Sequence, residues 1–277
     1  MQISTPLAHQ THCHYKDFML ALTHYPAERP NHQPALLIVH GLFGSARNWG
    51  VIARHLATTR DVISVDQRNH GHSPHNASHS YTDMAADLAE VITHVGSPMD
   101  VLGHSMGGKA AMMLALTHAP LIRRLIVADI APVAYAHDNT QHTTAMLDMP
   151  LDGITTRAEA DRRLSATVPD PALRAFFLQS LDLKSTPPQW RLNLPVLADQ
   201  MHLIVGWPDV AGQFPNAALF LSGGKSHYVL PEHRPLIRAL FPKARFAKLP
   251  EAGHWLHADA PRAFEETVEV FLTAPPP

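Results

Sequence analysis

The sequence predicts an α/β protein with a mostly parallel central sheet, flanking helices and an inserted helical segment. Short, almost continuously apolar runs alternate with segments whose apolar residues have helical spacing. Such runs are typical of parallel strands that are buried on both faces. The alternation stops between residues 135 and 216, where no clear buried strand occurs. We therefore expect a core formed by residues 1–134 and 217–277, and a helical cap formed by residues 135–216.

The first half of the chain contains most of the expected core. Strands are expected at 35–41, 61–67, 99–105 and in the second half of 121–130. Helices are expected over the segments "NWGVIARHLAT", "YTDMAADLAEVITHVG" and "MGGKAAMMLALTHAP". In the second of these, Thr82 is the expected N-cap and Gly96 the expected end. Residues 3–25 are expected to form an antiparallel pair at the sheet edge.

The second half contains the insert and the end of the core. Thr156 and Glu159 form a capping-box pattern before "RAEADRRLSATV", and Asp170 before Pro171 indicates a second helix start. Two strands and a closing helix then follow at 216–224, 244–250 and 261–274, with Asp259 near the start of the helix.

Composition and charge exclude several classes of protein. The 277 residues carry a formal net charge of −2, and Lys and Arg form no cluster along the sequence. Neither a nucleic-acid-binding face nor a basic membrane-binding segment is therefore expected. No segment approaches about 18 consecutive apolar residues, the length that would predict a membrane span. The start "MQISTPLAHQ" lacks the pattern of a signal peptide, so a cytoplasmic location is expected.

The chain contains 21 histidines, and two groups of them suggest metal binding. These groups are "HCHY", with His12, Cys13 and His14, and "HGHSPH", with His70, His72 and His75. A structural zinc site needs a second Cys/His pair at a defined spacing, and the chain has a single cysteine. We therefore predict ordinary polar histidines, no metal and no cofactor.

The segment "VLGHSMGGKAAMM" combines two motifs. Its G-x-S-x-G pattern around Ser105 is the strand-to-helix turn that exposes a nucleophilic serine. Residues 103–109 also match most of a phosphate-binding loop, G-x-x-x-x-G-K. That loop needs a Ser or Thr hydroxyl next for Mg²⁺, and Ala110 stands there. The later "GGKS" has the serine, but Leu219 replaces its leading glycine, so the nucleophilic serine is favoured.

A nucleophile needs a base and donors for the oxyanion, all at the carboxyl ends of strands. The loop "VHGLFGS" offers the N–H of Leu42, and Met106 after the nucleophile offers the second. The base is expected after the last strand, where "LPEAGHWLH" contains His254 and His257. We predict His254, because His257 lies in the approach to the closing helix and is expected to turn away.

The acid is located by elimination. The chain order Ser, acid, His restricts it to residues 106–253. The loop after "ALFLSG" has no carboxylate before Glu232, and Ser226 stands where an Asp is expected. The preceding sheet strand, "LIVADIAPV", carries Asp129 at its carboxyl end, and we therefore predict Asp129. The alternative is a structural Asp129 that caps the loop before Pro132.

Four segments together resemble the α/β-hydrolase superfamily: "GHSMGG", "HGLFGS", "DQRNHGHS" and "AGHW". "GHSMGGKA" followed by "DIAPV" is similar, more narrowly, to small capped bacterial esterases and their mitochondrial relatives. In that group the acid follows the strand next to the nucleophile strand, which again implies Asp129. We also expect Asp66 and Arg68 to hold the loop beside the nucleophile, and Lys109 to face outward from the helix or to pair locally.

The resemblance implies a serine hydrolase that cleaves short- to medium-chain acyl esters of small molecules through an acyl-enzyme. Two alternatives use the same triad, a thioesterase acting on acyl-CoA and a carbon–carbon bond hydrolase. Another alternative is a non-catalytic receptor on the same fold. The residues expected to bind substrate are Phe43, Trp190, Trp207 and Tyr228. Four further residues of the insert either line an acyl pocket or pack the insert onto the core: Met146, Met149, Phe176 and Phe177.

Overall fold

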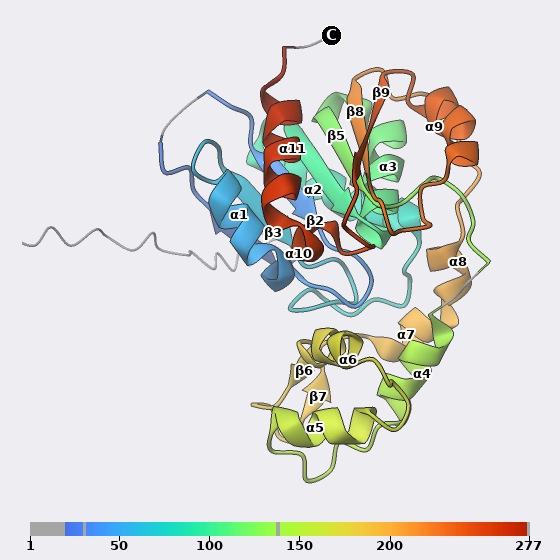
Figure 1. Ribbon diagram of the computed structural model, residues 1–277. Coiled ribbons are helices and arrows are strands. Elements are labelled where there is room, and N and C mark those ends of the chain that lie inside the picture. Colours follow the sequence, from blue (N-terminus) through green and yellow to red (C-terminus); the bar gives the residue numbers. More distant parts are fainter. Residues whose placement is uncertain (1–19, 30–31, 137–138, 276–277) are drawn as a thin grey trace, which may run out of the picture.

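The computed structural model describes residues 20–29, 32–136 and 139–275 and contains one large sheet (Figure 1). The strand order in this seven-stranded sheet is β1-β3-β2-β4-β5-β8-β9. At its edge, β1 (Leu22–Tyr25) runs antiparallel to β3 (Val62–Val65). The sequence predicted a partner for this edge strand within residues 3–25. The described partner of β1 is β3, and residues 3–19, the rest of the expected pair, lie outside the described part of the chain.

The remaining strands are parallel and occupy the predicted apolar runs. They are β2 (Leu36–Val39), β4 (Met99–His104), β5 (Ile122–Ala128), β8 (Ala217–Gly223) and β9 (Ala244–Leu249). Every residue of β2, β4 and β8 is buried, as expected for strands covered on both faces. The carboxyl ends of β2, β4 and β5 therefore meet at one edge of the sheet.

Helices cover both faces of the sheet (Figure 1). One apolar cluster includes side chains of α2 (Tyr81–Val95) and α3 (Met106–Thr117), and the other includes side chains of α1 (Gly50–Leu56) and α11 (Pro261–Thr273). The shorter elements of the core are η1 (Ala46–Trp49), η2 (Ala119–Leu121), η3 (Pro231–His233), α9 (Arg234–Leu240) and α10 (Leu256–Asp259). Among the described residues, no helix has the length and apolarity required to cross a bilayer.

The N-cap of helix α2 lies two residues before the predicted one, and the helix ends at the predicted glycine. Ser80, rather than Thr82, is the N-cap, because its hydroxyl accepts the Asp83 N–H at 3.2 Å. Thr82 already lies within the first turn. The helix does end at Gly96, whose φ of 83° is the left-handed conformation that glycine adopts at little cost.

The inserted segment lies between β5 and β8 in the chain and forms its own group of helices to one side of the sheet (Figure 1). It contains α4 (Thr140–Asp148), α5 (Arg157–Leu164), α6 (Pro171–Leu178), α7 (Leu194–Asp199) and α8 (Met201–Val205). The predicted N-caps Thr156 and Asp170 both accept backbone N–H groups. The strands β6 (Leu181–Asp182) and β7 (Gln189–Trp190) were not predicted, because two residues give no periodic signal.

Candidate active site

Ser105 occupies a sharp turn between β4 and α3. Its φ of 52° and ψ of −122° form a backbone conformation that L-residues rarely adopt. The turn is possible because glycines flank it. A Cβ at Gly103 would lie 2.3 Å from the carbonyl oxygen of Gly107, and one at Gly107 would lie 2.4 Å from that of His40. The G-x-S-x-G pattern therefore forms the predicted serine-exposing turn.

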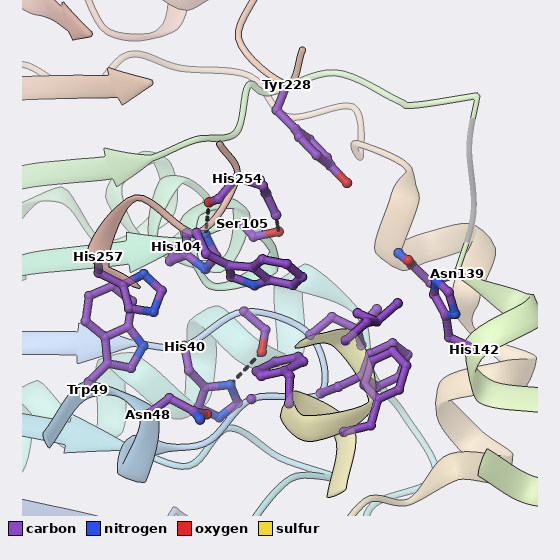
Figure 2. Close-up of a pocket in the computed structure, with 18 residues that line it drawn as sticks. His40, Asn48, Trp49, His104, Ser105, Asn139, His142, Tyr228, His254 and His257 are labelled. Atoms are coloured by element: carbon purple, nitrogen blue, oxygen red, sulfur yellow. Dashed lines mark hydrogen bonds between the residues drawn. The ribbon is translucent and has the colours of Figure 1, made fainter. Parts of the chain in front are cut away.

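The structure brings Ser105, His254 and Asp129 together. The His254 Nε2 atom lies 3.0 Å from the Ser105 Oγ atom (Figure 2), and the His254 Nδ1 atom lies 2.8 Å from the Asp129 Oδ2 atom. An Nδ1–H that donates to the carboxylate leaves the Nε2 lone pair directed at the serine hydroxyl. This arrangement allows the imidazole to remove the serine proton.

Asp129 is fully buried, and donors surround its carboxylate. The Gly223 N–H donates to Oδ1 at 3.0 Å, and the Ser226 hydroxyl donates to Oδ2 beside His254. These hydrogen bonds offset the cost of burying a charge. Ser226 stands where an Asp is expected after β8, and its hydroxyl contacts the Asp129 carboxylate that the neighbouring strand supplies. Glu232, the next carboxylate along the chain, is exposed in η3 and does not contact Asp129 or His254 among the described interactions.

Two further residues hold the His254 imidazole and its loop. His104 precedes the nucleophile, and burial lowers its pKa well below 6.5, so its ring is neutral. Its Nε2–H donates to the backbone carbonyl of His254 at 2.8 Å. The Tyr228 ring stacks on the His254 ring, with centroids 4.0 Å apart and planes inclined by 21°. Sequence reasoning missed the role of His104, because its partner lies 150 positions away.

The predicted oxyanion donors lie beside the nucleophile. Leu42 and Ser105 line both the main pocket and a small adjoining cavity, which Met106 also lines. Met106 is the first residue of α3, so its N–H has no acceptor inside the helix. The N–H of Phe43, the next residue of the loop after β2, is already donated to His70 Nε2 at 3.2 Å.

Two buried histidines fix the loop that carries Leu42. His40 accepts the Gln67 N–H at 2.9 Å and donates to the Gly41 carbonyl at 2.8 Å. His70 accepts the Phe43 N–H and donates to the Arg68 carbonyl at 3.0 Å. Burial lowers their pKa values to about 4 and about 3 respectively, so both rings are neutral near pH 7.

The segment "DQRNHGHS" is structural in the way the sequence analysis expected. Asp66 accepts the backbone N–H groups of Ala46 and His72 at 2.7 and 2.8 Å, which ties the loop to η1. Arg68 pairs with Asp87 on α2 at 2.6 Å. Within the described residues, no three His, Cys, Asp or Glu side chains are grouped as metal ligands. The "HCHY" tract lies outside the described residues.

A pocket of about 290 Å³ opens at Ser105. Figure 2 shows Trp49 and His257 on one side of it and Asn139 and His142 on the other. Its apolar wall is formed by aromatic and aliphatic side chains, including the predicted Phe43 and Tyr228: Leu42, Phe43, Leu173, Phe176, Phe177, Tyr228 and Trp255. The Phe43 ring meets the Phe177 ring edge-on at 5.3 Å.

Trp190 and Trp207 do not line this pocket, contrary to the sequence-based expectation. The Trp190 indole N–H donates to the carbonyl of Met146 at 3.0 Å, and Trp207 packs beside Tyr81. Trp190 is half-buried, and the backbone of the insert supplies the acceptor for its indole N–H. Met146 and Met149 are buried within the same apolar cluster and not in the pocket.

His257 and Lys109 both differ from the prediction, because His257 lines the active-site pocket instead of turning away from it, and Lys109 is buried. His257 stacks on Trp49 with ring centroids 4.1 Å apart, and burial lowers its pKa to about 4. Lys109 is 1% exposed, so the expectation that it faces outward is wrong. Its Nζ atom donates to the carbonyls of Val205 and Gly206 at 2.9 and 2.5 Å. The helix α3 is apolar around Lys109, which is the signal that predicts burial on all sides.

Ser105 lies at a strained strand-to-helix turn and is hydrogen-bonded to a histidine that a buried carboxylate orients. This combination defines a serine hydrolase built on a parallel sheet. The chain belongs to the alpha/beta hydrolase fold family, whose model matches residues 34–261.

Individual relatives cover most of the chain. The sn-1-specific diacylglycerol lipase ABHD11 of Mus musculus is 39% identical over 250 residues, which are 86% of this chain and 81% of the relative. Esterase YbfF of Escherichia coli (strain K12) is 36% identical over 248 residues, 89% of this chain and 96% of the relative. A solved structure, a marine microorganism esterase, has a TM-score of 0.86 and 34% identity, and the match covers 92% of this chain and 100% of that one.

Proposed function

We propose that the protein is a carboxylic ester hydrolase that cleaves short- to medium-chain acyl esters of small molecules, with Ser105, His254 and Asp129 as its catalytic residues. The observation that carries this proposal is the continuous hydrogen-bonded path from the Ser105 hydroxyl through the His254 imidazole to the Asp129 carboxylate. The names of the relatives, esterase and diacylglycerol lipase, support the reaction class.

The proposed reaction has two halves. The Ser105 oxygen attacks the ester carbonyl carbon while His254 Nε2 takes the serine proton. When the tetrahedral intermediate collapses, the carbon–oxygen bond of the ester breaks, and His254 returns the proton to the departing alkoxide. Water then attacks the acyl-enzyme with His254 again as base, which releases the acid and restores Ser105. The N–H groups of Leu42 and Met106 stabilise each oxyanion, by about 3 kcal/mol per donor.

Asp129 and Tyr228 stabilise the imidazolium that forms in both halves. The Asp129 carboxylate fixes the tautomer of His254 and lies 2.8 Å from its Nδ1. The Tyr228 ring presents its negatively polarised face to the imidazolium.

The inserted segment is proposed to act as a cap that selects the substrate. Residues 135–216 contribute five residues to the wall of the pocket: Asn139, His142, Leu173, Phe176 and Phe177. The rest of the wall comes from residues 1–134 and 217–277, which we propose form the catalytic core. A pocket of about 290 Å³ is at the lower end of the range for small-molecule sites, which favours short- and medium-chain acyl groups.

Replacement of the nucleophile tests the proposal. We expect Ser105→Ala to lower kcat for p-nitrophenyl butyrate by roughly 10⁴–10⁶, with an unchanged circular dichroism spectrum. Labelling of the wild type by a fluorophosphonate probe should be lost in the same variant. Full activity of Ser105→Ala would refute the mechanism, and tight ligand binding without labelling would favour a receptor.

A comparison of p-nitrophenyl esters with acyl-CoA substrates separates the esterase from the thioesterase alternative. No cofactor is required by the steps above, and a cytoplasmic location stays a prediction from the sequence.

A further inference from the structure

A second cavity, of about 520 Å³, is lined in part by residues that directly follow or precede residues of the active-site pocket in the chain. Its lining includes three arginines, Arg47, Arg54 and Arg191, although Lys and Arg form no cluster along the sequence. We propose that this cavity binds a phosphate group carried by the leaving alcohol of the substrate. This inference rests on the proposed function, because it assigns the substrate class of the same active site.

The charges around the cavity carry the inference. The lining contains three guanidinium groups and one carboxylate, that of Asp66. Asp66 is buried and already accepts the N–H groups of Ala46 and His72. The lining therefore has an excess of two positive charges, in a protein whose formal net charge is −2. A phosphate monoester carries about −1.5 to −2 at pH 7, which matches this excess.

Neighbouring residues leave that excess in place. Asp182 pairs with Arg191 at 2.8 Å, from outside the lining. Arg157 adds a further positive charge there, and burial together with the charge of Arg47 lowers its pKa. The His72 Nε2 atom lies 2.5 Å from the Arg191 Nη1 atom.

The arginines come from two different parts of the chain. Arg47 and Arg54 belong to η1 and α1 of the core, and neither has an ion-pair partner among the described residues. Arg157 and Arg191 belong to the inserted segment. Like charges that converge across such a junction repel one another, and a bound anion removes this cost. The planar guanidinium fork also matches the oxygens of a phosphate group.

The position of the cavity connects it to the reaction. Consecutive residues of one short helix line the two cavities, since Asn48 and Trp49 line the pocket at Ser105 and Arg47 lines the second cavity. The Asn48 side-chain amide donates to the Gln179 side chain at 2.7 Å, so this bridge marks the boundary between them. With the acyl chain in the apolar pocket, the alcohol part of the ester passes this bridge toward the arginines.

A matched series of esters tests the proposal. The probes are butyrate esters of ω-phosphooxy alkanols with two to eight methylene groups, each paired with the ω-methoxy ester of equal length. We expect at least one phosphorylated ester to have a KM at least tenfold below that of its neutral partner, with similar kcat in a pH-stat assay. The preference should weaken in 1 M NaCl, where the screening length falls to about 3 Å.

Arginine variants provide the second arm. In the double variant Arg47→Gln/Arg54→Gln, the ratio of the two KM values should fall to about one, and each single variant should lower it part of the way. Both side chains are exposed, and thermal melting checks that the variants fold. The control Arg162→Gln removes the same charge from an exposed position on α5 outside the cavity, and should leave the ratio unchanged.

The KM values separate a failure of the phosphate site from a failure of the proposed function. Equal KM values for phosphorylated and neutral partners at every length would overturn the phosphate site, as would a preference that survives in the double variant or is lost equally in Arg162→Gln. If neutral esters are hydrolysed normally in those cases, the proposed function stands and the phosphate site alone fails. If the wild type hydrolyses neither class of ester, the proposed function itself fails.

Discussion

The carboxylate of Asp129 accepts hydrogen bonds on both of its oxygens, which makes Asp129→Asn a stringent test of the triad. Oδ1 accepts the Gly223 N–H at 3.0 Å, and Oδ2 accepts the His254 Nδ1–H at 2.8 Å together with the Ser226 hydroxyl. An asparagine offers one acceptor and one donor group in place of these two acceptors. Either orientation of its amide therefore places an NH₂ group against an existing donor.

The cost to catalysis follows from the orientation that the amide takes. With its NH₂ toward His254, the ring must accept on Nδ1 and carry its hydrogen on Nε2, so it cannot take the Ser105 proton. The opposite orientation sets the NH₂ against the Gly223 N–H in a fully buried site. We expect kcat to fall by about 10⁴, which corresponds to about 5.4 kcal/mol of activation free energy. The free energy of unfolding should fall by about 1–3 kcal/mol, because a buried donor loses its acceptor.

The assay is the initial rate of p-nitrophenyl butyrate hydrolysis over a range of substrate concentrations. Urea unfolding reports the change in stability separately from the change in kcat. The matched control is Glu232→Gln, which changes the exposed carboxylate that follows β8 and should retain full activity. An active Asp129→Asn together with an inactive Glu232→Gln would show that the acid has been assigned to the wrong residue.

Two further predictions concern neighbours of the site. Tyr228→Leu removes the ring that stacks on His254 and should lower kcat by about 2- to 30-fold, the equivalent of about 0.5–2 kcal/mol, while an unchanged kcat would exclude a role for the ring. Burial lowers the pKa of Lys109 to about 7, so between pH 7 and about 10.4 the folded state binds fewer protons than the unfolded state. Urea unfolding should therefore show wild-type stability rising with pH relative to Lys109→Met, by at most about 1.4 kcal/mol per pH unit, and a difference that stays constant from pH 7 to 9 would contradict this.

The sequence was sufficient where function depends on local backbone geometry or on chain order. The elbow at Ser105 follows from its flanking glycines, since any side chain there would overlap backbone atoms. Asp129 could be reached by elimination, because no carboxylate follows β8 before Glu232. Most strand positions followed from the apolar runs for the same local reason.

Contacts between distant segments could not be predicted in this way. The position of Trp190 depends on how the insert folds upon itself, and its spacing from neighbouring apolar residues does not encode that. The acceptors of the Lys109 ammonium, the carbonyls of Val205 and Gly206, depend on where the end of α8 returns to the core. The arginine-lined cavity likewise exists only after residues 47 and 191 have been brought together.

The backbone of Ser105 is hydrogen-bonded to the strand before Asp129, and that of Asp129 to β8. Nucleophile and acid thus follow adjacent strands of the sheet, β4 and β5. Ser226, in the loop after the next strand, β8, contacts the Asp129 Oδ2 atom, which also contacts His254. A single point in space is therefore accessible from two adjacent strand termini. During divergence of such enzymes, the acidic group can migrate from one terminus to the other without any displacement of the imidazole it serves.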